Sequence, residues 1–128
     1  MDRTILVGPK IKEGGQLLRS LDKAGFQVTA ALWLYESEPD RWRLMIASPL
    51  VDSKGPKAAY DRIQSSIETS KVGDSLALSE ISAVGPKDPV IKALRMAVHT
   101  GPGISGIRFS RNTINNIFIE DAYIYRVE

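Results

Sequence analysis

Residues 26–47, FQVTAALWLYESEPDRWRLMIA, contain two strand-like segments that flank a turn, and they decide the predicted fold. Residues 26–35 and 41–47 are rich in β-branched, aromatic and leucine side chains that alternate along the chain, a pattern that favours β-strands. The intervening residues 36–40, Glu-Ser-Glu-Pro-Asp, have the composition of a turn. We therefore expect the two segments to pair as an antiparallel hairpin.

The flanking sequence predicts a second hairpin and three helices. Strands are expected at residues 81–84, 104–110 and 116–127, the last two joined around residues 112–115, and residues 3–7 are a further strand candidate. Helical spacing of apolar residues predicts a first helix that ends at Gly25, and helices at residues 56–70 and 90–98. Gly14 and Gly15 weaken the first helix, which suggests a late start or a backbone passing close. Each helix follows a Gly-Pro-Lys tripeptide, and proline costs no hydrogen bond in a first helical turn.

The resulting order, (β)αββαβαββ, indicates the α+β class. We expect one domain over residues 1–128, with a mixed, mainly antiparallel sheet of about five strands packed against three helices. The 128 residues are 43% hydrophobic and 25% charged, with a net charge of +2, which is ordinary for a soluble domain. The absence of cysteine fits a reducing compartment, and we expect a cytoplasmic protein without a membrane anchor.

One motif suggests a metal-dependent enzyme. Pro39-Asp40 followed by Asp52-Ser53-Lys54 has the written form of the nuclease signature PD-(D/E)xK. If the residues between them form mostly one strand, the two aspartates lie roughly 35–40 Å apart, too far to share an ion. The alternative function is a metal-dependent nuclease or phosphohydrolase that uses Asp40, Asp52, Glu120 or Asp121, and Lys54, and it requires at least two of these carboxylates to converge in the fold.

Two loops suggest an anion site. Residues 101–106 spell G-x-G-x-x-G, but a helix precedes them and a strand follows, which is the reverse of the dinucleotide-binding order. The simplest interpretation is a plain turn, and the alternative is an anion site formed by Gly101, Gly103, His99, Arg108 and Arg111.

The second loop, residues 48–56, joins a predicted strand to a predicted helix. Asp52 or Ser53 is expected to cap that helix. The free amides at the helix start, with Lys54 and Lys57, form the second candidate site for an anion or nucleotide.

The leading functional hypothesis concerns aromatic and arginine residues. Alternation places Trp33 and Tyr35 on the same face as Arg41 and Arg43, opposite the expected core. The last strand adds the segment Tyr123-Ile124-Tyr125-Arg126. Such residues are enriched at binding hot spots, although they also form a second core layer with arginine stems over rings.

We therefore expect a non-enzymatic binding or accessory domain that uses this face. The expected partner is another protein or a second copy of the chain, with nucleic acid as the alternative. No metal or cofactor is expected.

Overall fold

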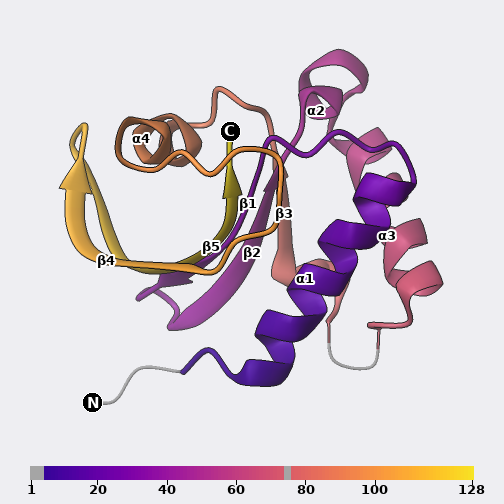
Figure 1. The fold of residues 1–128 in the computed structure, drawn as a ribbon, viewed down its shortest axis with the longest axis horizontal. Helices are drawn as coiled ribbons and strands as arrows, with labels where there is room; N and C mark the ends of the chain where they lie inside the picture. The colour runs from indigo at the N-terminus through magenta and orange to yellow at the C-terminus, as the bar shows by residue number, and fades with distance from the viewer. Residues whose placement is uncertain (1–4, 74–75) are drawn as a thin grey trace.

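The protein contains a five-stranded sheet with helices on both sides (Figure 1). The computed structural model describes residues 5–73 and 76–128. The strands, in spatial order β3-β2-β1-β5-β4, are β1 (Ala30–Glu36), β2 (Arg41–Ala47), β3 (Ile81–Val84), β4 (Ile107–Ile114) and β5 (Ile117–Val127). The helices are α1 (Gly8–Lys23), α2 (Pro49–Lys54), α3 (Pro56–Ser70) and α4 (Pro89–Ala97), with a 3₁₀ turn, η1 (Leu78–Glu80). Every helix of the described ranges is too short or too polar to cross a bilayer.

The predicted α+β class and both hairpins are confirmed. β1 pairs with β2, and β4 with β5, both antiparallel, while β3 joins β2 in parallel after the α2–α3 connection. The β4–β5 turn is formed by Asn115 and Asn116, whose φ angles of 52° and 66° suit a tight hairpin turn. Of the strand candidate at residues 3–7, residues 3 and 4 lie outside the described residues, and residues 5–7 form no strand.

Proline lies in the first turn of each of the four α-helices in the described residues. The helix α2 was not expected, because residues 48–56 were interpreted as a loop. The predicted cap by Asp52 or Ser53 is wrong: the residue before α3 is Gly55, with no side-chain cap. Instead Ser48 caps α2, its Oγ accepting from the Leu50 amide at 3.2 Å.

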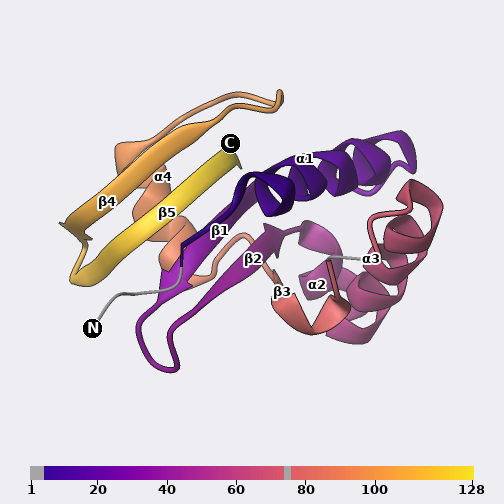
Figure 2. The same ribbon diagram turned by 90° about the horizontal axis from the view of Figure 1, so that it is seen from below.

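Both faces of the sheet are buried. Helices α1 and α3 pack on one face and α4 packs on the other (Figures 1 and 2). β1 is a central strand, between β2 and β5. Because successive side chains of a strand point to opposite faces, those of β1 alternate between two cores. This double coverage explains the uninterrupted apolar run from Ala30 to Leu34, which is typical of a central strand.

The predicted common face of Trp33 and Arg43 is wrong. The β1–β2 register pairs Trp33 with Leu44, and Leu34 with Arg43. Residues directly opposite each other in an antiparallel pair share a face, so the tryptophan and the arginine point to opposite sides. Trp33 lies in the core under α1, with 1% of its surface exposed.

Gly14 is explained by side chains, and the predicted late helix start is wrong, because α1 begins at Gly8. A Cβ on Gly14 would clash with the hydroxyl of Tyr125 and lie 2.9 Å from Nε1 of Trp33. Gly14 therefore lets α1 approach the sheet closely. Close contact was foreseen, but it comes from side chains and not from a backbone.

Candidate functional site

A groove of about 550 Å³ opens where the beginnings of α1 and β2 meet η1. Its volume falls in the range of small-molecule sites, roughly 300–1,000 Å³. We call it the Trp42 groove. Its lining residues are Ile5, Leu6, Val7, Lys10, Trp33, Arg41, Trp42, Arg43, Ser79 and Glu80.

The apolar part of the Trp42 groove has an exposed wall and a buried aromatic base. Ile5 and Val7 are 77% and 50% exposed, whereas Trp42 is 8% exposed. The Trp42 ring is held by Tyr35, with ring centroids 5.4 Å apart. Exposed aliphatic side chains beside a concave aromatic surface are typical of a ligand site.

Two of the three cations in the groove have carboxylate partners. The Lys10 Nζ lies 2.8 Å from Oε2 of Glu80 and so links α1 to η1. Glu80 also accepts from the Ala77 amide at 3.0 Å. Arg41 pairs with Glu36 at 3.0 Å, in an exposed contact across the β1–β2 hairpin.

The third cation, Arg43, leaves β2 on the face opposite Trp42, reaches the groove at the edge that β3 does not cover, and is held by neutral atoms. Its Nε donates to Oγ of Ser82 at 2.7 Å, and its terminal nitrogens donate to the carbonyls of Ile81 at 3.2 Å and Ser79 at 3.5 Å. These contacts fix the half-buried guanidinium against the segment that leads into β3. Within the described part of the chain, no carboxylate lies within ion-pair distance of Arg43.

A second polar cluster adjoins the other side of Trp42. Arg108 lies over the Trp42 ring, 5.6 Å from its centroid, and donates to both oxygens of Asp121 at 3.0 and 2.9 Å. The hydrogen bond to Asp121 raises the pKa of the Arg108 guanidinium, so the cation is held firmly. Tyr35 donates to Asp40 at 2.6 Å. The structure thus brings Arg108, Asp121, Tyr35 and Asp40 together around Trp42.

The carboxylates of the nuclease hypothesis lie in different places: Asp40 and Asp121 border Trp42 through Tyr35 and Arg108, whereas Asp52 lies in α2 with Lys54. Asp40 and Asp52 lie beyond opposite ends of β2, whose seven residues span roughly 20 Å at about 3.3 Å each. The Asp52 carboxylate packs against Gly85, where a Cβ would lie 2.5 Å from its Oδ1. Lys54 is exposed in α2, and Glu120 is half-buried in β5. Among the residues that the structure describes, no three His, Cys, Asp or Glu side chains could hold a metal ion.

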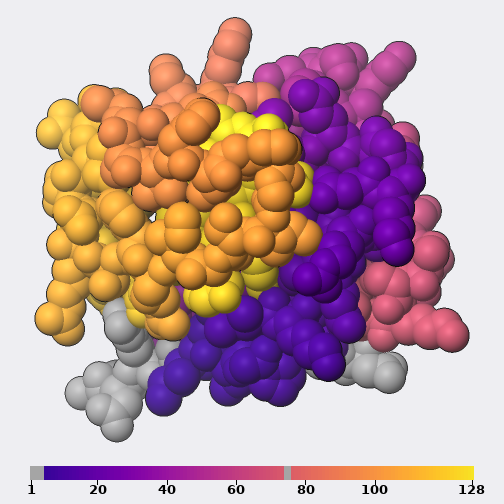
Figure 3. Space-filling view, in the orientation of Figure 1, coloured from indigo at the N-terminus to yellow at the C-terminus, as the bar shows by residue number. Residues whose placement is uncertain are grey.

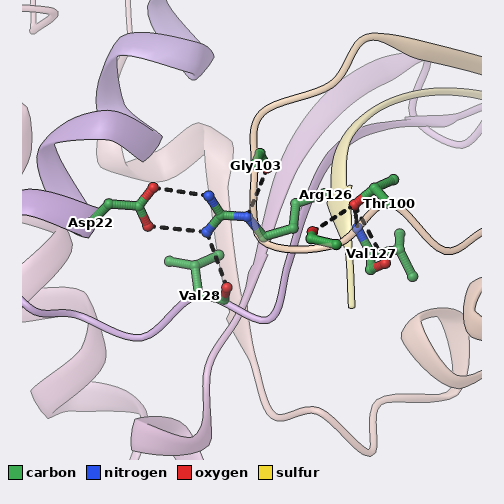
Figure 4. Close-up of polar contacts among 7 residues, drawn as sticks. Asp22, Val28, Thr100, Gly103, Arg126 and Val127 are labelled. Atoms are coloured by element: carbon green, nitrogen blue, oxygen red, sulfur yellow. Dashed lines mark hydrogen bonds and ion pairs between the residues drawn. The ribbon is translucent and has the colours of Figure 1, made fainter.

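Arg126 belongs to the interior. It is 3% exposed and forms a two-pronged ion pair with Asp22, at 3.0 and 2.8 Å. It also donates to the carbonyls of Gly103 at 3.0 Å and Val28 at 3.1 Å (Figure 4). One side chain therefore ties β5 to α1, to the segment before β1 and to the segment after α4. In Figure 3 this last segment (orange) lies over β5 (yellow).

The tyrosines of β5 also have structural contacts. Tyr125 is 2% exposed; its hydroxyl accepts from Nε1 of Trp33 at 3.0 Å and donates to the carbonyl of Ile11. Burial raises the pKa of the Tyr125 phenol above its usual value. Tyr123 is half-buried, with its ring centroid 5.4 Å from that of Tyr125.

The 99–111 segment is bonded to β5. Gly101 has a φ of +77°, which favours glycine, and Gly106 fits against the Tyr123 hydroxyl. The Thr100 and Ser105 amides donate to β5 carbonyls at 2.9 and 2.7 Å. Arg108 is bound to Asp121, while His99 and Arg111 are exposed. The anion site at this segment stays a prediction.

Sequence reasoning missed the groove itself. Trp42, residues 5–7, Lys10 and Glu80 were not among the predicted site residues. The triplet Arg41-Trp42-Arg43 was the available signal, since a tryptophan between two arginines is unusual for a purely apolar core strand. The contribution of α1 and η1 depends on contacts between segments about 70 residues apart, such as Lys10 with Glu80.

Comparison with known proteins gives no relative: no family model, no curated protein and no solved structure matches the chain significantly. The geometry of the Trp42 groove is therefore the basis for inferring a function.

Proposed function

We propose that this protein is a small binding domain whose site is the Trp42 groove, and that the groove takes the apolar part of a small molecule. The observation that carries the proposal is a groove of about 550 Å³ that combines exposed aliphatic residues with a tryptophan surface and fixed charges. A cytoplasmic location is part of the proposal, and the absence of cysteine supports it.

A small ligand suits this geometry better than a large partner surface. A stable protein interface buries about 800 Å² on each partner. Most of the aromatic and arginine residues expected to form such a face are buried in the core; Trp33, Tyr125 and Arg126 are at most 3% exposed. Of that set, Trp33, Arg41 and Arg43 line the groove, together with Trp42.

Tryptophan fluorescence offers a direct test. The chain has two tryptophans, Trp33 and Trp42, and both line the groove. Titration with octanoate, octanamide and octylammonium should give a saturable change in emission with at least one compound. The variant Val7→Asn should weaken that binding about tenfold, because the mutation removes an apolar contact.

Val7→Asn is a suitable variant because Val7 is the N-cap residue of α1, where asparagine is favourable. Met96→Asn is the matched control, since Met96 is an exposed apolar residue, at 69%, on α4 across the sheet. Absence of saturable binding at millimolar concentration, or equal weakening by both variants, would contradict the proposal. Sedimentation of the unliganded protein as a stable dimer would favour self-association instead.

A further inference from the structure

We propose that the ligand of the Trp42 groove is an amphipathic carboxylate, with its apolar chain against Trp42 and Val7 and its carboxylate on Arg43. This inference rests on the proposed function and adds the chemical class of the ligand. It follows from the state of Arg43, the one cation of the described groove lining that has no carboxylate partner.

Arg43 is a half-buried charge compensated only by neutral acceptors. A buried cation loses hydration, and neutral hydrogen bonds restore only part of that free energy. A guanidinium has five N–H groups, and the contacts of Arg43 with Ser82, Ile81 and Ser79 use three. Two N–H groups of Arg43 are not used in these contacts. A carboxylate accepts two N–H groups when it forms a bidentate contact with an arginine.

The position of Arg43 is fixed before any ligand arrives. The 2.7 Å bond from Nε to Ser82 and the bond to the Ile81 carbonyl hold the guanidinium against β3. A prearranged cation loses little side-chain entropy on binding. An exposed and unrestrained arginine would lack this advantage.

The remaining charges of the groove also favour an acid. Among the described residues, the lining has three cations, Lys10, Arg41 and Arg43, and one anion, Glu80. Lys10 and Arg41 have their own partners in Glu80 and Glu36. The excess positive charge would therefore repel a cationic ligand. A carboxylate would instead be attracted to the Arg43 guanidinium, which has no carboxylate partner in the described residues.

The test compares octanoate with octanamide, which share an apolar chain and differ in charge at one end. At pH 7.5 and low ionic strength, tryptophan fluorescence should show octanoate binding at least about tenfold more tightly than octanamide. Octylammonium should bind more weakly than both. In Arg43→Gln the affinities for octanoate and octanamide should agree within about twofold.

Arg41→Gln is the matched control, because Arg41 lies on the same strand and lines the groove but is already paired with Glu36. It should keep the preference for octanoate. Equal binding of octanoate and octanamide to the unaltered protein would overturn the inference whether or not Arg43→Gln folds, and so would loss of the preference in Arg41→Gln. Failure of all three compounds to bind would instead refute the proposed function.

Discussion

Replacing Gly14 by alanine should destabilise the protein, although the same change elsewhere in α1 should stabilise it. In an open helical position Gly→Ala contributes about 1 kcal/mol of stability. At Gly14 the new Cβ would clash with the Tyr125 hydroxyl and lie 2.9 Å from Nε1 of Trp33. That hydroxyl cannot move away freely, because it accepts from Trp33 and donates to the Ile11 carbonyl.

The net cost follows from these opposing effects. Overpacking a filled core costs typically about 1–3 kcal/mol, and a disturbed buried hydrogen bond adds about 1 kcal/mol. Subtracting the helix gain leaves a loss of about 1–3 kcal/mol, or roughly 3–10 °C in Tm for a domain of this size. Gly15→Ala is the matched control, because its nearest new neighbour is Cε1 of Tyr125 at 3.8 Å, an ordinary contact. It should stabilise by about 0.5–1 kcal/mol.

Urea denaturation followed by far-UV circular dichroism would measure both variants. A third variant, Gly14→Ala with Tyr125→Phe, removes the clashing hydroxyl and should recover part of the loss, so the two changes are not additive. Equal stabilisation by Gly14→Ala and Gly15→Ala would refute the reasoning. So would strict additivity of Gly14→Ala and Tyr125→Phe.

Three further predictions concern β5 and its contacts. Folding raises the pKa of Tyr125 above its unfolded value near 10. The stability that comes from the neutral phenol is therefore complete below about pH 10 and falls as pH rises above it, by up to about 1.4 kcal/mol per pH unit. Tyr125→Phe should make this alkaline loss shallower in denaturation curves at pH 9–11, and an unchanged slope would argue against a buried phenol. Arg126→Met should lower the free energy of unfolding by about 2–4 kcal/mol, because the buried guanidinium joins three segments to β5. Amide hydrogen exchange at residues 98–106 should accelerate, and undiminished protection there would count against the network. Gly106→Ala should destabilise the protein because of the Tyr123 hydroxyl, whereas Gly103→Ala, with open space at its Cβ, should be nearly neutral by thermal denaturation; equal effects would contradict that packing.

The secondary structure was readable because it depends on neighbours in sequence. The strand at residues 41–47 and the helix at 56–70 have the predicted bounds. Alternation and helical spacing record which side chains are apolar along one element, and that information is local. The turn composition of residues 36–40 likewise set the β1–β2 hairpin.

Which face each strand presents was harder to predict. A strand that is buried on both sides has apolar residues at every position, so alternation cannot say which set meets which helix. The register decided it, by pairing Trp33 with Leu44 and Leu34 with Arg43. A one-residue difference in register exchanges the two faces of a strand. Trp33 therefore lies in the core and not on the open face where it was expected.

Taken alone, the sequence determined the α+β class, the two hairpins and the helix entries at proline, because these depend on local propensity and spacing. The tertiary structure decided that the aromatic residues of β1 and β5 are core, that Gly14 admits Tyr125, and that the Trp42 groove exists. The groove combines residues 5–10, 41–43 and 79–80, and only packing of the folded chain brings segments so distant in sequence into one site.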